Sequence, residues 1–399
     1  MKMFKKLSML FILFSTIALT ATTPKKASNQ KSAPKDSPNA NRFALVDKVV
    51  NAAIKDSAFP GAVVLIAQDS AIIYEKAYGH FTYDPNSTPV SWNTIYGLAS
   101  VSKVISTTTA TMMCYDRGLI KLDDPVAKYL PAFGKNGKEK VTIKNLLLHD
   151  SGLRPDITRP FSSFDTVKNK PQAVMNEIYN DTLVYPTGSK MVYSDLNMIL
   201  MGKVIEKVTG KTLDKFAEQN IFKPLAMYST MYNPPASLRY RIAPTEYDST
   251  WRHRQIWGEV HDETASLLGG VAGHAGLFST AGDMARLLQM LLQKGTYEGK
   301  QFIKPSTVEL FTKRQSDLST RALGWDTKSP TGYSSAGHLF SNLSYGHAGF
   351  TGTSVWTDPT RDLFVVFLTN RVYPTRKDLK ILGVRPKLHD AVIESLENK

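Results

Sequence analysis

Strand-forming residues gather near both ends of the globular part of this 399-residue chain, and helical patterns fill the stretch between them. Two β-branched runs at residues 61–67 and 71–78 are separated by Gln-Asp-Ser and predict an antiparallel hairpin. Strand patterns return at residues 354–357 and 363–369. The distribution predicts an α/β (α+β) fold in which both chain ends build one antiparallel sheet, flanked by helices, with a mostly helical lobe inserted in the middle.

Helices are predicted where apolar residues recur every three to four positions. The first is marked by Phe43, Val46, Val50 and Ile54. The others cover residues 101–117, 143–149, 196–208, 213–222, 284–292 and 387–396. Thr280 and Asp283 are expected to form a capping box just before the helix at 284–292. No long linker interrupts these patterns, so one domain is predicted over residues 41–399.

The first residues have the pattern of an export signal. Three lysines precede an apolar run at residues 7–21, which falls short of the roughly 20 apolar residues that span a bilayer. We therefore expect a signal peptide at 1–21 and a periplasmic or secreted protein. The small residues near its end give no clean cleavage motif, so an uncleaved membrane tether stays open. Residues 22–40 lack Leu, Ile, Val and aromatic residues and predict a disordered stalk.

The charge pattern argues against nucleic-acid binding, and the cysteine count excludes a fold held by internal disulfides. The formal net charge is +14, but much of the excess belongs to the signal and the stalk, and the remainder forms no basic helix or basic-aromatic run. Nucleic-acid binding is therefore not expected. The single cysteine, Cys114, excludes an internal disulfide. It stands in an apolar helical stretch, where a free cysteine is typically a small buried hydrophobe and not a nucleophile.

One short segment carries the residue types of a nucleophile and its activating group. The sequence GLASVSKV at residues 97–104 stands where an extended segment gives way to a helix. Residues three apart share a helix face, so Lys103 is expected beside the Ser100 hydroxyl, whereas Ser102 points elsewhere. A serine becomes nucleophilic when a neighbouring base takes its proton. Lysine can be that base if desolvation or the helix N-terminus lowers its pKa. The spacing alone also occurs in many surface helices.

Two further motifs follow in order. Tyr193-Ser194-Asp195 stands about ninety residues after Ser100, and His347-Ala348-Gly349 follows much later. The segments TIKNLLLHDSGL at 142–153 and TAGDMARLL at 280–288 accompany them. With these motifs, the chain resembles the serine β-lactamase and penicillin-binding-protein superfamily. The likeness is to the class C β-lactamase-like branch, which also contains carboxylesterases and D-alanyl-D-alanine carboxypeptidases.

The resemblance implies roles for particular residues. Ser100, Lys103 and Tyr193 would be catalytic, with Tyr193 as a proton shuttle whose phenolate the lysine ammonium favours. The backbone amides of Ser100 and Phe350 would form the oxyanion hole. Asp195, His347, Gly349 and Phe350 would line the substrate-binding side. The family resemblance implies neither a metal nor another cofactor.

The third motif departs from the Lys-Thr-Gly of β-lactamases. His347 replaces lysine by a group only partly charged at neutral pH, and Ala348 removes a hydroxyl. The second motif ends in Asp195, where the family usually has asparagine, and this adds a negative charge. Recognition of a substrate carboxylate should weaken, so β-lactam hydrolysis is expected to be weak.

A glycine-rich segment between residues 242 and 276 contains His261, Asp262 and His274. These residues could suggest a metal, but no ligand pair with helical i, i+4 spacing supports one. We expect them to hold a loop by hydrogen bonds, with the glycines permitting a tight turn beside the cleft.

Two functional hypotheses follow. The first is an exported serine hydrolase that acts through an acyl-enzyme on D-alanyl amides of peptidoglycan type or on esters, with a small molecule or a peptidoglycan peptide as substrate. The second is a catalytically inert receptor of the same fold that binds cell-wall peptides or a partner protein. The presence of Ser100, Lys103 and Tyr193 favours the enzyme, because an inert relic would be free to lose them.

Overall fold

A computed structural model describes residues 42–397. The predicted signal peptide at 1–21 and stalk at 22–40 lie outside the described residues. Within the described part, no helix combines the length and apolar character that crossing a membrane requires.

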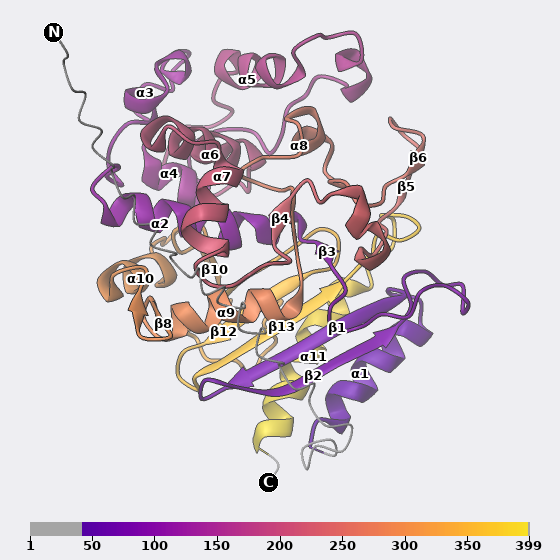
Figure 1. The fold of residues 1–399 in the computed structure, drawn as a ribbon. Helices are drawn as coiled ribbons and strands as arrows, with labels where there is room; N and C mark the ends of the chain where they lie inside the picture. Colours follow the sequence, from indigo (N-terminus) through magenta and orange to yellow (C-terminus); the bar gives the residue numbers. More distant parts are fainter. Residues whose placement is uncertain (1–41, 398–399) are drawn as a thin grey trace, which may run out of the picture. The chain divides into compact units, whose positions relative to one another are not determined.

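The central element is a six-stranded antiparallel sheet with the strand order β10-β11-β12-β13-β1-β2 (Figure 1). The strands cover β1 Gly61–Gln68, β2 Ala71–Gly79, β10 Asp326–Thr327, β11 Tyr345–Ala348, β12 Ser354–Asp358 and β13 Leu363–Thr369. Strand β1 pairs with β13, so that Leu65 lies opposite Val366. The two chain ends therefore meet in the middle of one sheet, which confirms the predicted fold class.

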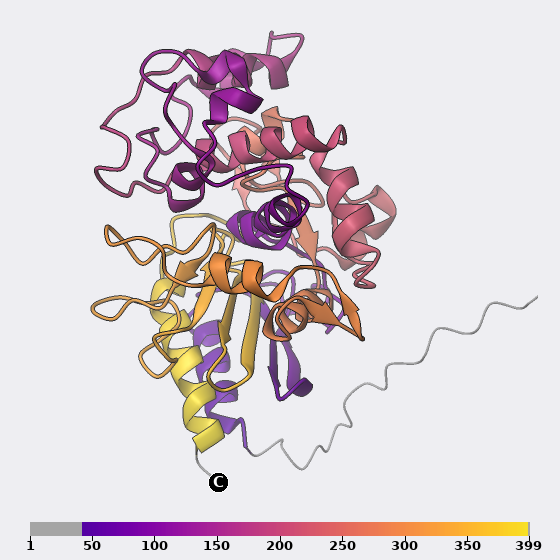
Figure 2. The same ribbon diagram turned by 90° about the vertical axis from the view of Figure 1, so that its left-hand side faces the viewer.

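Both faces of the central strands are buried, which explains why all but the last residue of β1 and of β13 is apolar. Val63 and Leu65 of β1 point into the larger core cluster, whereas Val64 and Ile66 point into a second cluster. The second cluster lies under the terminal helices α1 (Ala44–Lys55) and α11 (Ile381–Glu397). Figure 2 shows α11, in yellow, along one face of the sheet, and α9, in orange, on the other side.

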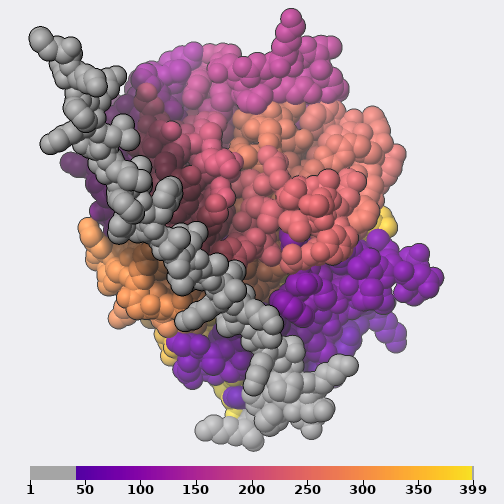
Figure 3. Space-filling model, viewed as in Figure 1, coloured from indigo at the N-terminus to yellow at the C-terminus, as the bar shows by residue number. Residues whose placement is uncertain are grey.

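The middle of the chain forms the predicted helical lobe above the sheet in Figure 1. Side chains from this segment, coloured magenta to salmon, fill the upper part of the face seen in Figure 3. The remaining helices are α2 Thr109–Asp116, α3 Val126–Tyr129, α4 Ile143–Leu148, α5 Lys170–Asn180, α6 Asp195–Thr209, α7 Leu213–Ala217, α8 Glu263–Leu267, α9 Ala281–Leu292 and α10 Pro305–Thr312. The short strands are β3 Tyr96–Gly97, β4 Met231–Tyr232, β5 Tyr247–Asp248, β6 Arg254–Gln255, β7 Leu277–Ser279, β8 Thr296–Tyr297 and β9 Lys300–Gln301.

The helix predicted at residues 101–117 is not one regular α-helix. A 3-10 turn at Ala99–Val101 leads into a π-helical segment at Lys103–Thr108, and α2 follows. Buried threonine hydroxyls compete with regular backbone pairing here, since Thr109 Oγ1 donates to the carbonyl of Val104. π-Helical turns inside helices are frequent at functional sites.

The capping box predicted at Thr280 and Asp283 is half formed. Thr280 Oγ1 accepts a hydrogen bond from the Asp283 amide at the start of α9. The Asp283 carboxylate accepts from the Ser229 amide and from Thr230 Oγ1, and not from the Thr280 amide as a full capping box requires. A full capping box forms at the start of α4, between Thr142 and Asn145.

Candidate active site

The backbone bends sharply just before Ser100. Strand β3 pairs with β7, and the chain then turns through Ala99, whose φ of 48° lies in the left-handed region. Such a conformation is uncommon for a residue with a side chain, and it is found most often where surrounding structure enforces it at functional sites. The turn places Ser100 between the strand and the helical segment that follows.

Lys103 is fully buried beside Ser100, as the spacing predicts. Its ammonium donates to Ser100 Oγ at 2.9 Å and to the carbonyl of His274 at 3.0 Å, and lies 2.7 Å from the carboxylate of Asp195. Burial alone would lower the lysine pKa, but Asp195 and Tyr193 more than offset it and raise the pKa of Lys103 to about 12. A lowered pKa, the condition under which Lys103 could act as the base, is therefore not met, because the ion pair with Asp195 stabilises the charged form. Lys103 is an ammonium at neutral pH.

Tyr193 lies among cationic and aromatic groups. Lys103 Nζ is 5.0 Å from the centre of the Tyr193 ring, and the guanidinium carbon of Arg321 is 5.1 Å from it. The ring of His149 stacks on Tyr193 with centroids 4.7 Å apart. The Tyr193 hydroxyl is buried and has no hydrogen-bond partner among the described residues.

His149 fixes the segment that carries Tyr193. It ends α4 in the left-handed conformation, with φ of 57°. Its Nδ1 accepts the backbone amide of Ser194 at 3.1 Å. Burial, together with the charges of Arg321 and Lys103, holds the pKa of His149 well below its usual range, so the ring is neutral. Because Nδ1 is an acceptor, the proton of the neutral ring is on Nε2.

Two hydrogen bonds connect the turn after β11 to the segment before Ser100. Thr351 Oγ1 donates to the Gly97 carbonyl and Thr353 Oγ1 to the Leu98 carbonyl, each at 2.8 Å. A side chain at Gly349 would come 2.5 Å from the Leu98 carbonyl, so this close approach requires glycine. The Phe350 amide, predicted as an oxyanion donor, donates to no acceptor among the described residues.

His347 is buried on β11 and does not act as a cation. Its Nδ1 lies 2.8 Å from the Ala348 carbonyl, to which the neutral ring donates. Desolvation, reinforced by the charges of Arg321 and Lys103, holds the pKa of His347 well below its usual range. The expectation of a partly charged histidine is therefore corrected to a neutral one.

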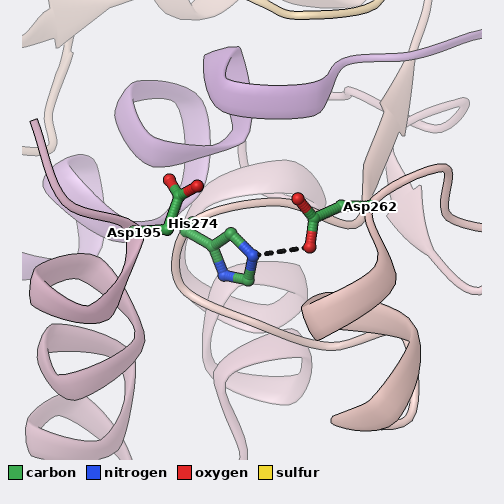
Figure 4. A group of neighbouring side chains, drawn as sticks. All are labelled: Asp195, Asp262 and His274. Atoms are coloured by element: carbon green, nitrogen blue, oxygen red, sulfur yellow. Dashed lines mark hydrogen bonds and ion pairs between the residues drawn. The ribbon is translucent and has the colours of Figure 1, made fainter. Parts of the chain in front are cut away.

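Asp195 belongs to a group of acidic and imidazole side chains beside the lysine, and its substrate-binding role stays a prediction. Ligand atoms of Asp195, Asp262 and His274 lie within 4.8 Å of one another (Figure 4). His274 Nε2 bonds to Asp262 at 2.8 Å, and the Lys103 ammonium pairs with Asp195, so protein contacts link the members of this group to one another and to the lysine. His261 does not belong to this group. It lies 3.2 Å from Glu246 and stacks on Phe350.

Arg321 is a site residue that the sequence motifs missed. It precedes β10 on a turn that pairs it with Asp326, and 9 % of its surface is exposed. Its nearest carboxylate, that of Asp326, is 4.0 Å away. Two of its nitrogens, Nε and Nη1, are buried without an acceptor among the described residues. The structure therefore offers an unsatisfied guanidinium beside Tyr193, at a position that belongs to none of the three motifs.

The sheet and the inserted helical lobe, with the Ser-x-x-Lys, Tyr-Ser-Asp and His-Ala-Gly motifs at their junction, are the features of the β-lactamase-type hydrolase fold. The family model described as Beta-lactamase matches residues 46–385, and the chain belongs to this family.

A protein of Escherichia coli O157:H7 named "Putative D-alanyl-D-alanine carboxypeptidase" is 33% identical over 400 residues, which cover 92% of this chain and 91% of that protein. An N-acetylmuramyl-L-alanine amidase of Bacillus subtilis is 34% identical over 82% of this chain and 80% of its own length. The crystal structure of a penicillin-binding protein homologue from Caulobacter crescentus shares the fold, with a TM-score of 0.71 at 22% identity, over 89% of this chain and 98% of that one. The family and these relatives support a hydrolase.

Proposed function

We propose that the protein is a serine hydrolase that cleaves D-alanyl amide bonds of peptidoglycan type through an acyl-enzyme on Ser100. The observation that carries the proposal is the contact of 2.9 Å between Lys103 Nζ and Ser100 Oγ, with the lysine held by Asp195 and facing Tyr193. Each of these groups has a role in acyl transfer, and a binding protein would need none of them in this arrangement.

The proton of Ser100 goes to Tyr193 in this mechanism. The Lys103 ammonium has no lone pair, so it donates to Ser100 Oγ and cannot accept the proton. In this proposal Tyr193 reacts as the phenolate, after its own proton has gone to solvent, so that its oxygen can accept the Ser100 proton; the cations of Lys103 and Arg321 lie at its ring. As Ser100 Oγ bonds to the carbonyl carbon, the amides of Ser100 and Phe350 stabilise the oxyanion.

Collapse of the tetrahedral intermediate breaks the bond to the leaving group. The leaving amine takes the proton from Tyr193, and the acyl group stays on Ser100. A water molecule then attacks the ester carbonyl and gives its proton to Tyr193, which returns it to Ser100 Oγ as the acid product leaves.

Arg321 favours a substrate with a carboxylate next to the scissile bond. A nearly buried guanidinium with two unpartnered nitrogens is a strong site for an anion, and a fork of donors matches a carboxylate. Because His347 is neutral, Arg321 supplies the positive charge that the third motif lacks. The carboxypeptidase name of the Escherichia coli relative agrees with this choice. Simple esters would be secondary substrates, and β-lactams would be hydrolysed weakly.

The test compares two peptides that end in D-alanyl-D-alanine, one with a free carboxylate and one with a terminal amide. Wild-type enzyme should cleave the free acid faster. Arg321→Met should lose about 10- to 100-fold in kcat/KM on the acid only, as expected for one charged hydrogen bond. Arg314→Met, which removes a guanidinium from outside the Tyr193 site, is the matched control. Equal losses on both peptides would contradict the carboxylate role, and no turnover of any peptide or ester would favour the inert receptor.

Export is part of the proposal. It is supported by the apolar run at 7–21 and by the cell-wall substrates in the names of the relatives. Fractionation of cells followed by N-terminal sequencing tests it. A mature N-terminus near Thr22 would establish secretion, the full chain in the membrane fraction would establish a tether, and the full chain soluble in the cytoplasm would contradict export.

A further inference from the structure

The peptide unit between Gly349 and Phe350 carries the proposed second donor of the oxyanion hole. A peptide unit is planar, so its carbonyl and its amide point in opposite directions and cannot turn independently. Whatever holds the Gly349 carbonyl therefore also sets the direction of the Phe350 N–H. In this structure, Arg385 Nη2 donates to the Gly349 carbonyl at 2.6 Å.

Arg385 closes the base of the same turn. Its Nη2 also donates to the Thr353 carbonyl at 2.9 Å, and that carbonyl accepts the Gly349 amide at 2.7 Å. The side chain starts on α11, which packs with α1 against the sheet. The arginine thus links the C-terminal helix to the two backbone positions at which the turn begins and ends.

The charge of Arg385 is buried without an ion-pair partner. Only 4 % of the residue is exposed, and no carboxylate of the described residues lies within ion-pairing distance. Burial lowers the pKa of Arg385 to about 10, so it remains charged at neutral pH. Arginine is almost never fully buried unless it is paired, because desolvation of a lone charge is costly. Two carbonyl oxygens alone are a weak compensation, and a requirement of the site would explain why the charge is kept.

We propose that Arg385 is a positioning residue for the oxyanion hole, which holds the 349–350 peptide with its N–H toward Ser100 and strengthens that N–H as a donor. The guanidinium withdraws electron density through the Gly349 carbonyl, which makes the amide at the other end of the peptide more positive. The inference rests on the proposed function, since an oxyanion hole has meaning only for acyl transfer.

Arg371 provides a comparison within the same turn. Its Nε donates to the Phe350 carbonyl at 2.7 Å, and its guanidinium carbon lies 4.3 Å from the centre of the Phe350 ring. The Phe350 carbonyl shares its peptide with the amide of Thr351, not with the amide of Phe350. Loss of Arg371 should loosen the turn without removing the polarising contact on the 349–350 peptide.

The experiment measures the infrared carbonyl stretch of a cinnamoyl-enzyme, formed with trans-cinnamoylimidazole and identified by a ¹³C label in the carbonyl. A weaker oxyanion hole raises this frequency. Arg385→Met should raise the carbonyl frequency and slow acylation about 10- to 100-fold, with little change in KM. Arg385→Lys should raise the frequency less. Arg371→Met should raise it least of the three. Leu388→Ala, which removes core packing from α11 three residues further along, should lower the melting temperature and leave the frequency unchanged.

The outcomes separate the two proposals. An unchanged frequency and acylation rate in Arg385→Met would overturn the role of Arg385 alone, and so would an equal frequency shift in Leu388→Ala. If Arg385→Met does not fold, Arg385→Lys compared with Leu388→Ala decides, and no shift in the lysine variant overturns the inference. Failure of the wild-type protein to form any adduct at Ser100 would overturn the proposed function and this inference with it.

Discussion

The ammonium of Lys103 lies 2.7 Å from the carboxylate of Asp195, the first residue of α6. This ion pair decides the protonation state of the lysine, because burial without it would favour the neutral amine. The pair therefore explains why a fully buried lysine is charged and donates to Ser100, and it is the reason that the proposed mechanism assigns the proton transfer to Tyr193.

Replacing Asp195 tests this relationship. In Asp195→Asn the burial of Lys103 is no longer offset by the carboxylate, so its pKa should fall and kcat/KM should decline on the alkaline side at lower pH than in wild type. We expect a loss of about 10- to 1,000-fold in kcat/KM at neutral pH, which corresponds to about 1.4–4 kcal/mol of transition-state stabilisation. The measurement is a pH profile of kcat/KM on one substrate. Asp181→Asn, which removes a carboxylate paired with Arg154, is the control, and an unshifted profile in Asp195→Asn would contradict the account.

Asp156 should make stability depend on pH. Burial, with added repulsion from Asp262, raises the pKa of Asp156 to about 6. An acid with a raised pKa in the folded state contributes stability that is fully present below its unfolded pKa of 3.8 and is lost as pH rises through about 6. Asp156→Asn should therefore stabilise the protein by about 1–3 kcal/mol above pH 6 and change little near pH 4.

Urea unfolding of wild type and Asp156→Asn at both pH values measures this difference. The Asp156 carboxylate also accepts from Thr264 Oγ1, and Thr264→Val provides the control for the loss of that hydrogen bond without loss of the charge. A variant that is equally stabilised at both pH values would show that ionisation of Asp156 is not the cause.

The third motif should govern activity on β-lactams. The double change His347→Lys with Ala348→Thr introduces a permanent cation and a hydroxyl where β-lactamases carry them. Turnover of a chromogenic cephalosporin should rise about tenfold or more relative to ester hydrolysis, with some loss of stability because His347 is buried. Ala348→Thr alone separates the hydroxyl from the charge. If wild type already hydrolyses cephalosporins faster than esters and peptides, these two residues do not set the preference.

Local spacing was enough to predict the sheet and the contact between Ser100 and Lys103. Alternating or continuous apolar runs define strands, and two residues three apart on a helix must share a face. The resemblance supplied Tyr193, His347 and Phe350; the structure places the ring centres of Tyr193 and His347 6.1 Å apart, and Phe350 lies in the turn after β11, the strand that carries His347. Their catalytic and substrate-binding roles stay predictions.

The remaining features depend on contacts between distant parts of the chain. Lys103 and Asp195 are far apart in sequence, so the lysine pKa could not be inferred from the residues around it. Arg321 belongs to a turn without a motif, and only the pairing of β10 with β11 brings it to the site. Arg385 lies on α11, and packing in the core sets the position of this helix against the sheet. No pattern in the residues around Arg385 predicts its hydrogen bonds with the turn after β11.

Identification of the acylated residue tests the central claim most directly. Wild-type protein, Ser100→Ala and Ser102→Ala are incubated with a fluorescent phosphonate, and the adduct is located by mass spectrometry of peptides. Ser102 Oγ accepts the Leu277 amide in the core, so Ser102→Ala should lose about 1–3 kcal/mol of stability and still be labelled. We expect one adduct, on Ser100, in the wild type and in Ser102→Ala, and neither label nor turnover in a folded Ser100→Ala. Undiminished hydrolysis by Ser100→Ala, or an adduct on another residue, would contradict the account.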